Sequence, residues 1–485
     1  MKRRQFNRYL GQGLAAMGLG PLLTQCDRAQ PLSGQSGLPY QALPLLTSQN
    51  GVLEASLTAQ WKVSGNARKQ LSYNGHAPGP IIEARPGDTV RLTLTNELDS
   101  STNLHFHGLH ISPDIDNVFR EVTAGGSYTY EFQIPDNHPA VTGWYHPHYH
   151  GLVAQQVFGG LAGPIIIRGD LDDIPEIQQA EEALLVLQDF DAALVESPEI
   201  LSPLAKKWGR EGVVLLANGQ QNPIIELPQD GLLRLRLINA SASRIYQLQL
   251  KNHPWHLMAT DRGAIAEPTE LETLSLSPGE RAELLIPGQR QPGSYPILSL
   301  PYDRGIGDML SAMGDAMQQM PGLAPSKTTT LATLRYAARQ RTVPVPLPKQ
   351  LIPVASIATP VTTREFVLNH GNDASTKTAG FIINNQAFAM GRVDTQVSLN
   401  TVEDWHIINK ASMDHPFHLH TNRFQVIERN GKPESLRAWK DTVAIGGYET
   451  VTLRVKFEDF TGRTVYHCHI LDHEDQGMMG IVEIT

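Results

Sequence analysis

Residues 74–96 read NGHAPGPIIEARPGDTVRLTLTN, and this stretch decides the fold class. A turn rich in Gly and Pro leads into a short strand, a second turn and a longer strand. In the longer strand, apolar residues at positions 90, 92 and 94 alternate with polar residues at 91, 93 and 95. A period of two residues is typical of a β-strand with one buried face.

The same arrangement occurs twice more along the chain. Residues 218–239 read NGQQNPIIELPQDGLLRLRLIN, and a weaker third copy begins with NNQAF at 384–388 and ends with TVEDWHIIN at 401–409. Long helical patterns are nearly absent, so we expect an all-β protein. Three copies at the spacing of a small domain predict three Greek-key β-sandwich domains.

The length of 485 residues suits three domains, at a prior of about 150 residues per domain. We place a signal and linker at 1–38, and the three domains at 39–172, 173–342 and 343–485. The stretch TVPVPLP at 342–348 has the composition of a linker into the third domain.

The N-terminus predicts export. MKRRQF puts Arg3 and Arg4 before a weakly apolar run at 10–23, a pattern typical of a twin-arginine signal. The alternative is a membrane anchor, but the run is Gly-rich, stops at Pro21 and is shorter than the ~20 apolar residues of a spanning helix. We therefore expect a periplasmic protein without a stable membrane span. Cys26 could carry a lipid, but Gln25 stands where a lipoprotein has a small residue, so lipid anchoring is disfavoured.

The overall charge of the chain indicates which classes of partner it does not bind. The formal net charge is -9, which argues against nucleic acid and anionic membrane surfaces because both require clustered Lys and Arg. We expect a monomer whose partners are small molecules or ions. The chain has two cysteines, and the motif around Cys468 described below favours a thiolate metal ligand, so no disulfide is expected.

The segment HCHILDHEDQGM at 467–478 places a thiol, three imidazoles and a thioether close together. On a strand that runs into a loop, Cys468 faces one side while His467 and His469 face the other. One strand would therefore contact two metal sites. His473 and Met478 follow at equal spacing, and one further His would complete the His₂Cys set with a weak axial Met of a blue copper.

More histidines of this kind lie upstream. MDHPFHLH at 413–420 offers His415 to the first site and a His-x-His pair to the second, and HFHG at 105–108 and HPH at 146–148 add two further pairs. A single such pair is usually solvated or satisfied, and a single buried Cys is usually inert. Here ten of the eighteen histidines fall on one pattern together with Cys468, which favours metal ligands.

These motifs, HxHG, HxH, HxxHxH and HCHxxxHxxxxM in this order, resemble those of the multicopper oxidases of the bacterial laccase-like and cuprous oxidase types. The resemblance implies three cupredoxin-like domains and four copper ions, one type 1, one type 2 and two type 3. It assigns type 1 copper to His415, Cys468, His473 and Met478; type 2 to His105 and His418; and the type 3 pair to His107, His146 and His469 and to His148, His420 and His467. The second site would then join the first and third domains.

The activity that the resemblance implies is one-electron oxidation of a phenolic donor or of Cu(I) at the type 1 copper. This step is coupled to four-electron reduction of O2 to water at the trinuclear cluster, with Cys468 and its bonded neighbours as the electron path. Asp116 and Glu474 match acidic positions that lie near the oxygen site in similar bacterial enzymes. We take both as candidate catalytic acids, and the alternative is a pair of ordinary solvated carboxylates.

Methionines suggest a donor site. Met309, Met313, Met317 and Met320 would share one face of a helix, where soft thioethers could bind Cu(I). The alternative is a short amphipathic helix that uses Met as core filling. Met413 matches a position that in cuprous oxidases helps to hold the substrate ion, although Ala411 replaces the expected acidic partner.

Three other functions are alternatives for this chain. A dedicated cuprous oxidase in copper tolerance is the first alternative. A non-catalytic exported relative, such as a cell-division factor, is the second, but such relatives lack the Cys and most of the histidines. A copper nitrite reductase is the third, but it would not use four His-x-His pairs.

Overall fold

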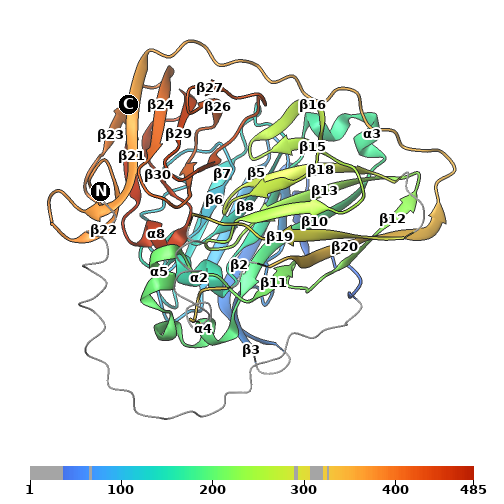
Figure 1. Cartoon of the computed structure of the whole chain (residues 1–485), viewed down its shortest axis with the longest axis horizontal. Coiled ribbons are helices and arrows are strands. Elements are labelled where there is room, and N and C mark those ends of the chain that lie inside the picture. The colour runs from blue at the N-terminus through green and yellow to red at the C-terminus, as the bar shows by residue number, and fades with distance from the viewer. Residues whose placement is uncertain (1–36, 65–67, 289–292, 306–319, 325–326) are drawn as a thin grey trace, which may run out of the picture. The chain divides into compact units, whose positions relative to one another are not determined.

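The computed structural model describes residues 37–485 apart from 65–67, 289–292, 306–319 and 325–326. Strands dominate this part of the chain, and their six sheets fall into three successive pairs along the sequence (Figure 1). The all-β prediction is confirmed. Within these described ranges, no helix is long and apolar enough to cross a membrane.

The first pair of sheets, the first sandwich, uses the strands between 45 and 167. These are β1 (Leu45–Thr47), β2 (Val52–Ser64), β3 (Arg68–Tyr73), β4 (Ile81–Ala84), β5 (Thr89–Asn96), β6 (His105–His107), β7 (Ser127–Gln133), β8 (Val141–His146) and β9 (Gly163–Ile167), with helix α2 (Val153–Gly159) before β9. The sheet orders are β3-β2-β5-β7 and β1-β4-β9-β8-β6. Burial alternates along β5, as its sequence predicts.

The second sandwich uses the strands between 181 and 340. These are β10 (Glu181–Phe190), β11 (Val214–Ala217), β12 (Ile224–Gln229), β13 (Leu232–Asn239), β14 (Tyr246–Leu250), β15 (Trp255–Thr260), β16 (Gly263–Leu271), β17 (Leu274–Leu276), β18 (Arg281–Pro287), β19 (Ser294–Leu300) and β20 (Thr329–Gln340). The sheet orders are β11-β10-β13-β18-β15-β16 and β12-β20-β19-β14-β17. Five short helices in the described part of the chain accompany these strands. Two come before β10, namely η2 (Asp170–Asp173) and α3 (Pro175–Gln178), and three lie between β10 and β11, namely α4 (Ala192–Glu196), η3 (Pro198–Ile200) and α5 (Pro203–Trp208).

The third sandwich uses the strands between 362 and 484. These are β21 (Thr362–Asn372), β22 (Ala379–Ile383), β23 (Thr395–Val397), β24 (Thr401–Asn409), β25 (His415–Leu419), β26 (Phe424–Arg429), β27 (Lys432–Pro433), β28 (Thr442–Ile445), β29 (Thr450–Phe457), β30 (Gly462–Cys468) and β31 (Met479–Ile484). The sheet orders are β22-β21-β24-β29-β26-β27 and β23-β31-β30-β25-β28. Helix α8 (Leu471–Asp475) joins β30 to β31, where the sequence predicts a loop. The domain boundaries near 172 and 342 stay a prediction.

The three sequence repeats form the same turn in each sandwich. Asn74, Asn218 and Asn384 all adopt a positive φ of 52° or 53°. Asn and Gly tolerate this region, so tight hairpin turns favour them. In each copy the Asn side chain also bonds a neighbouring strand, as Asn74 does by donating to Ser56 O and accepting from Thr58 N. The repeat therefore marks a structural turn that is built three times.

One strand differs from its prediction. The alternation in LLRLRLIN predicts that Arg234 and Arg236 point to solvent, but β13 is buried along its whole length. Both guanidinium groups lie 2.7 Å from the carboxylate of Glu283, and Arg236 also donates to Thr142 of the first sandwich. The polar face of β13 therefore faces the first sandwich, and buried ion pairs replace the expected solvent.

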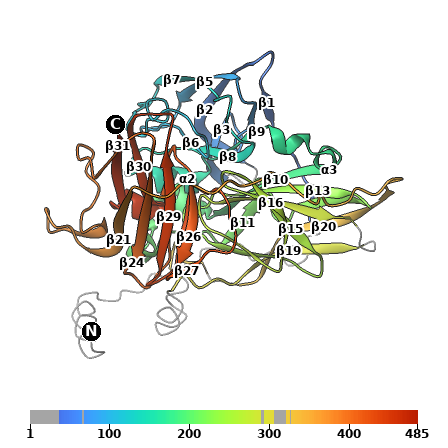
Figure 2. The ribbon, with the colours of Figure 1, turned by 90° about the horizontal axis from the view of Figure 1, so that it is seen from above.

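An apolar cluster joins the three sandwiches. It combines Trp144 and α2 residues of the first, residues of β10 and β13 of the second, and Leu471 of α8 in the third. Figure 2 shows β30 and β31 close to β6 and β8. The helix contacts between α2 and α8 agree with this view. The ends of strands from the first and third sandwiches consequently meet at one seam.

His138 provides a pH-dependent contribution to stability in the first sandwich. It is buried, accepts a hydrogen bond from His110 N through Nε2 and donates from Nδ1 to Pro139 O. Burial and the nearby Arg262 lower its pKa to about 3. In the unfolded chain the pKa is about 6.5, so only the unfolded state gains this proton as the pH falls.

We therefore predict that the free energy of unfolding decreases as the pH is lowered from about 6.5 to about 3, with His138 contributing up to about 1.4 kcal/mol per pH unit. Urea denaturation at several pH values measures the slope. His138→Gln should make it shallower, whereas the control His76→Gln, in a turn of the same sandwich, should not. Equal slopes for the wild type and His138→Gln would contradict the prediction.

Candidate metal centre

Two strands and a short helix place a thiol and two imidazoles together in the third sandwich. Cys468 ends β30, His415 begins β25 and His473 lies on α8. Cys468 Sγ lies 3.4 Å from His415 Nδ1 and 3.7 Å from His473 Nδ1, and the two nitrogens are 3.3 Å apart. Two ligands at about 2.0 Å from a tetrahedral ion lie roughly 3.3 Å apart, so these spacings suit one metal ion.

The surroundings of this thiol set also suit a metal. All three residues are fully buried, and burial raises the pKa of Cys468 well above its ordinary value. Burial lowers the pKa of His415 to about 3, so its imidazole is neutral. Met478 lies in the same buried core and accepts a hydrogen bond from Cys468 N through its backbone carbonyl. A cation at this place would stabilise the thiolate that the buried site otherwise disfavours.

His473 is held on two sides. Its Nε2 donates to the carbonyl of Lys207 on α5 at 3.0 Å, which leaves Nδ1 directed at Cys468. Its ring stacks on Phe381, with centroids 3.8 Å apart and planes 17° apart. The second sandwich therefore fixes the tautomer of a ligand that belongs to the third.

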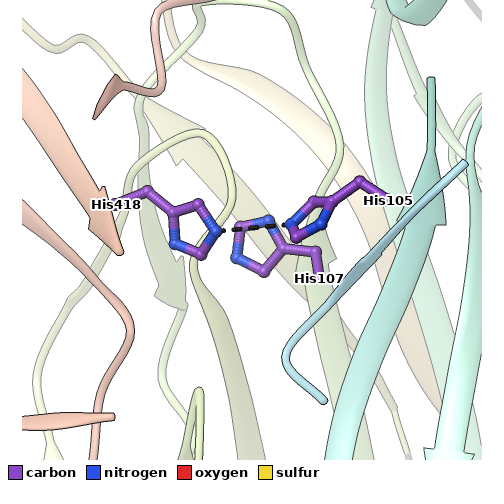
Figure 3. A group of neighbouring side chains, drawn as sticks. All are labelled: His105, His107 and His418. Atoms are coloured by element: carbon purple, nitrogen blue, oxygen red, sulfur yellow. Dashed lines mark hydrogen bonds between the residues drawn. The ribbon is translucent and has the colours of Figure 1, made fainter. Parts of the chain in front are cut away.

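Eight further histidines converge at the seam. His105 and His107 lie on β6, His146 ends β8 and His148 follows it. His418 and His467 lie on β25 and β30, and His420 and His469 directly follow these two strands. Figure 3 shows His105 and His418 directed at each other, with their Nε2 atoms 3.4 Å apart, and the His107 ring stacked on His418 with centroids 3.8 Å apart. Three groups of ligand atoms each lie within 4.8 Å: His105, His107 and His418; His107, His146 and His469; and His148, His420 and His467.

Unpartnered nitrogens test whether a metal fits this seam. Nδ1 of His107, Nε2 of His146 and Nε2 of His469 are buried without a hydrogen-bond partner. Each such atom costs about 1–3 kcal/mol unless something compensates it. Burial keeps these imidazoles neutral, with the pKa of His146 lowered to about 3. Three neutral lone pairs in one group match a bound metal ion and lack any other explanation in the described residues.

The second sandwich closes this group with a glycine. Gly279 has φ of 82°, and a Cβ there would come within 2.7 Å of the His469 ring and 3.0 Å of the His107 ring. Any larger residue would push these two imidazoles apart. Gly279 therefore serves both a left-handed turn and the close approach of backbone to the ligands.

The third group shows metal-like spacing most directly. Nε2 of His467 lies 3.2 Å from Nε2 of His148 and 3.1 Å from Nε2 of His420. The opposite nitrogens face carboxylates: Glu474 lies 3.1 Å from His467 Nδ1 and 3.4 Å from His148 Nδ1. With Nδ1 of each ring on the carboxylate side, the Nε2 atoms of His148 and His467 are directed at each other.

Asp116 performs the same task for another pair of imidazoles. It lies 2.9 Å from His105 Nδ1 and 3.4 Å from His420 Nδ1, and it accepts a hydrogen bond from Phe106 N. Asp116 and Glu474 are both buried. They are therefore not solvated loop carboxylates, and each one contacts two candidate ligands.

Comparisons with known proteins agree with this geometry. Three family models, all described as multicopper oxidase, match residues 57–172, 141–337 and 359–485. Among solved structures, the multicopper oxidase from Campylobacter jejuni, a metallo-oxidase, is 31% identical with a TM-score of 0.79, covering 93% of this chain and 96% of that one. The chain belongs to the multicopper oxidase family.

Curated relatives in this family carry two kinds of name. Multicopper oxidase mco of Staphylococcus haemolyticus is 28% identical, over 87% of this chain and 85% of that protein. Cell division protein FtsP of Escherichia coli K12 is 31% identical, over 92% and 91%. Overall identity consequently does not separate an oxidase from a cell-division protein, and the residues of the seam must do so.

This member of the multicopper oxidase family also has a buried residue at the seam that the sequence motifs do not indicate. Asp441 lies 3.2 Å from His107 Nε2, and its backbone carbonyl is 2.8 Å from His418 Nδ1. Arg281 of β18 holds its carboxylate with contacts of 2.6 and 2.7 Å. Asp441 stands 21 positions after His420, outside every histidine motif, so only the fold reveals its role.

The remaining candidates lie in different places. Met413 is buried in the core of the third sandwich, two positions before the candidate ligand His415. Met320 is described and partly exposed, whereas Met309, Met313 and Met317 lie outside the described residues. The structure therefore does not test the proposed methionine face.

Proposed function

We propose that this chain is a laccase-like copper oxidase. It would take single electrons from a phenolic or similar donor, or from Cu(I), and reduce O2 to water. The observation that carries the proposal is the convergence of ten buried imidazoles and one thiol from both ends of the chain, with ligand nitrogens lacking any hydrogen-bond partner. Copper bound there would supply the one-electron oxidation of the donor and the reduction of dioxygen.

The donor sets favour four copper ions. His415, Cys468, His473 and Met478 offer the soft set of a type 1 copper. His105 and His418 would hold the type 2 ion, and the two groups of three histidines would hold the type 3 pair. His107 fits the type 3 role because Asp441 engages Nε2 and leaves Nδ1 free.

The same residues argue against a role without catalysis. A cell-division protein needs no convergent set of neutral, unpartnered imidazoles. Purified protein loaded with copper should bind about four ions per chain, show the blue absorption of a thiolate-bound copper and consume O2. A colourless protein that stays poor in copper after loading would refute the oxidase.

Asp116 and Glu474 are proposed to supply protons for water formation as well as to hold ligands. We predict that Asp116→Asn and Glu474→Gln keep the copper content but slow O2 consumption by roughly 10²–10⁴-fold, the usual range for loss of a positioned acid. Oxygen uptake at saturating donor, beside metal analysis, measures this. Asp404→Asn, in a partly exposed ion pair of β24, is a matched control. Unchanged turnover in a variant would remove that residue from the mechanism.

The donor could be Cu(I), as in a dedicated cuprous oxidase. Tyr302 donates to Asp414, next to His415, and a Cβ on Gly305 would come within 3.1 Å of the Cα of Met413. The chain that carries Met309, Met313 and Met317 thus begins beside the thiol set. This position favours a methionine donor site there, and the C. jejuni relative is described as a metallo-oxidase.

We predict that replacing Met309, Met313 and Met317 with Leu lowers kcat/KM for Cu(I) at least about tenfold, a loss of about 1.4 kcal/mol, while oxidation of a phenol is retained. Leu keeps the apolar volume but removes the soft sulfur. Steady-state rates on both donors measure the effect. Met258→Leu, in the buried core of the second sandwich, is the control. Equal losses on both donors would rule out a specific copper site.

Export remains part of the proposal. The Arg3-Arg4 signal lies outside the described residues, and it supports twin-arginine export to the periplasm. An enzyme that folds around metal before export suits this route. Fractionation of cells that express the full chain, with and without Arg3→Lys and Arg4→Lys, would test the location.

A further inference from the structure

A small cavity opens on the seam beside the ligand His148. Its volume is about 70 Å³, and His148, His150, Phe388, Met390 and Met479 are among the residues that line it. One water molecule requires roughly 10–15 Å³ of such space, so the cavity has room for an ion together with a few water molecules. The cavity therefore leads from the surface to a residue of the third histidine group.

His150 brings an unused nitrogen to this cavity. Nδ1 of His150 is buried without a hydrogen-bond partner, and no group of convergent His, Cys, Asp or Glu ligands in the described chain includes His150. Its ring packs against Phe388, with centroids 4.7 Å apart. The imidazole is consequently held in place while one of its nitrogens remains uncompensated.

Two thioethers complete the lining. Met390 is 59% exposed, whereas Met479 is 2% exposed. Met479 is the first residue of β31 and pairs with His467 across the sheet. One methionine therefore lies at the surface, and the other lies beside a ligand of the third group.

We propose that His150, Met390 and Met479 form a Cu(I) site through which copper reaches the three-copper group. Two thioethers and an imidazole are a soft set that selects Cu(I) over harder cations. The ion would bind at Met390, pass to His150 and Met479, and leave to His148. Only metal–ligand bonds form and break in this transfer. No proton or electron is transferred, because copper stays Cu(I) throughout.

This inference rests on the proposed function in one respect, since it assumes that the seam histidines bind copper. The binding of a soft ion by His150 and the two methionines does not depend on that assumption. Ag(I), a closed-shell ion with the same preference for sulfur, can therefore probe the site in protein whose other sites are already filled with copper.

The test uses the full chain with His150→Gln, Met390→Leu and Met479→Leu, singly and as the His150→Gln/Met390→Leu pair. Met258→Leu, a buried methionine of the second core, and His76→Gln are matched controls. We expect the copper-loaded wild type to bind one more Ag(I) per chain than the paired variant. Apoprotein supplied anaerobically with Cu(I) should fill at least tenfold more slowly in that variant and reach the same final copper content.

Equal Ag(I) stoichiometry together with equal filling rates would overturn the proposal. An altered KM for O2 with unchanged Ag(I) binding would also overturn it and would assign the cavity to dioxygen passage. A wild type that never fills with copper would instead refute the proposed function, and Ag(I) binding would still decide whether the soft site exists. Met390→Leu alters an exposed side chain, so a folding defect in Met479→Leu would not obscure the result.

Discussion

Replacing Cys468 with Ser should remove one copper ion and the blue colour and should lower turnover with every donor. We expect a loss of roughly a thousandfold or more, beyond the 10–100-fold typical of a residue that only supports a metal ligand. Cys468 is the one thiolate donor beside His415 and His473 in the described chain. A serine hydroxyl is a hard neutral donor, so it cannot replace the soft anion that this copper prefers.

The same variant should leave the seam histidines able to bind copper. His467 and His469 adjoin Cys468 in sequence, but β30 directs them to the other side of the strand, where they join ligands from the first sandwich. We therefore expect about three copper ions per chain. Metal analysis, visible absorption and oxygen uptake measure these three quantities on one sample.

Protonation of the thiol gives a second readout. Burial raises the pKa of Cys468 well above its ordinary value, so the thiol must release its proton when copper binds. Copper affinity at this site should rise about tenfold per pH unit in the wild type, whereas Cys468→Ser should leave this site without copper at every pH. Cys26→Ser is the matched control. Retention of the blue absorption by Cys468→Ser would contradict the ligand assignment.

The sequence was sufficient to predict most of the candidate ligands because their spacing reflects local geometry. Alternation along one strand separates Cys468 from His467, and the repeated Asn-turn motif marks each sandwich. Both signals extend over a few residues and depend only on the pleat or on a positive φ. Short-range patterns of this kind can be recognised without knowing how the sandwiches pack.

Long-range partners could not be predicted in this way. The carbonyl of Lys207 fixes His473 from 266 positions away, and a carbonyl has no signature in the sequence. Arg234 and Arg236 read as solvent-facing because their acceptors, Glu283 and Asp172, lie elsewhere in the chain. Packing between sandwiches decides these interactions, so a local pattern carries no information about them.

Asp441 is the most consequential of these long-range residues. Its side chain and that of Arg281 are fully buried, with contacts of 2.6 and 2.7 Å, and they join the third sandwich to the second. Asp441→Ala would leave the guanidinium in the interior without this partner. We predict that the free energy of unfolding falls by about 3–5 kcal/mol, the usual cost of breaking a buried ion pair.

The variant should also weaken copper binding, for a separate reason. Asp441 holds Nε2 of His107, so its removal lets this imidazole rotate or change tautomer. Loss of a group that orients a metal ligand typically costs 10–100-fold in metal affinity, and we expect an effect of about that size. Denaturation of the apoprotein and competition for copper against a chelator measure the two effects independently.

A paired variant separates stability from metal binding. Asp441→Leu with Arg281→Met removes both buried charges, and apolar replacement of a buried ion pair is often neutral or stabilising. The pair should therefore regain most of the stability lost in Asp441→Ala, yet bind copper as weakly, because His107 still lacks its partner. Asp404→Ala, which breaks a partly exposed pair with Arg454, should cost about 1 kcal/mol or less and leave copper binding unchanged. Full recovery of copper affinity in the paired variant would show that Asp441 supports only the fold and that His107 is oriented by other contacts, such as the one with Thr442 at 3.2 Å.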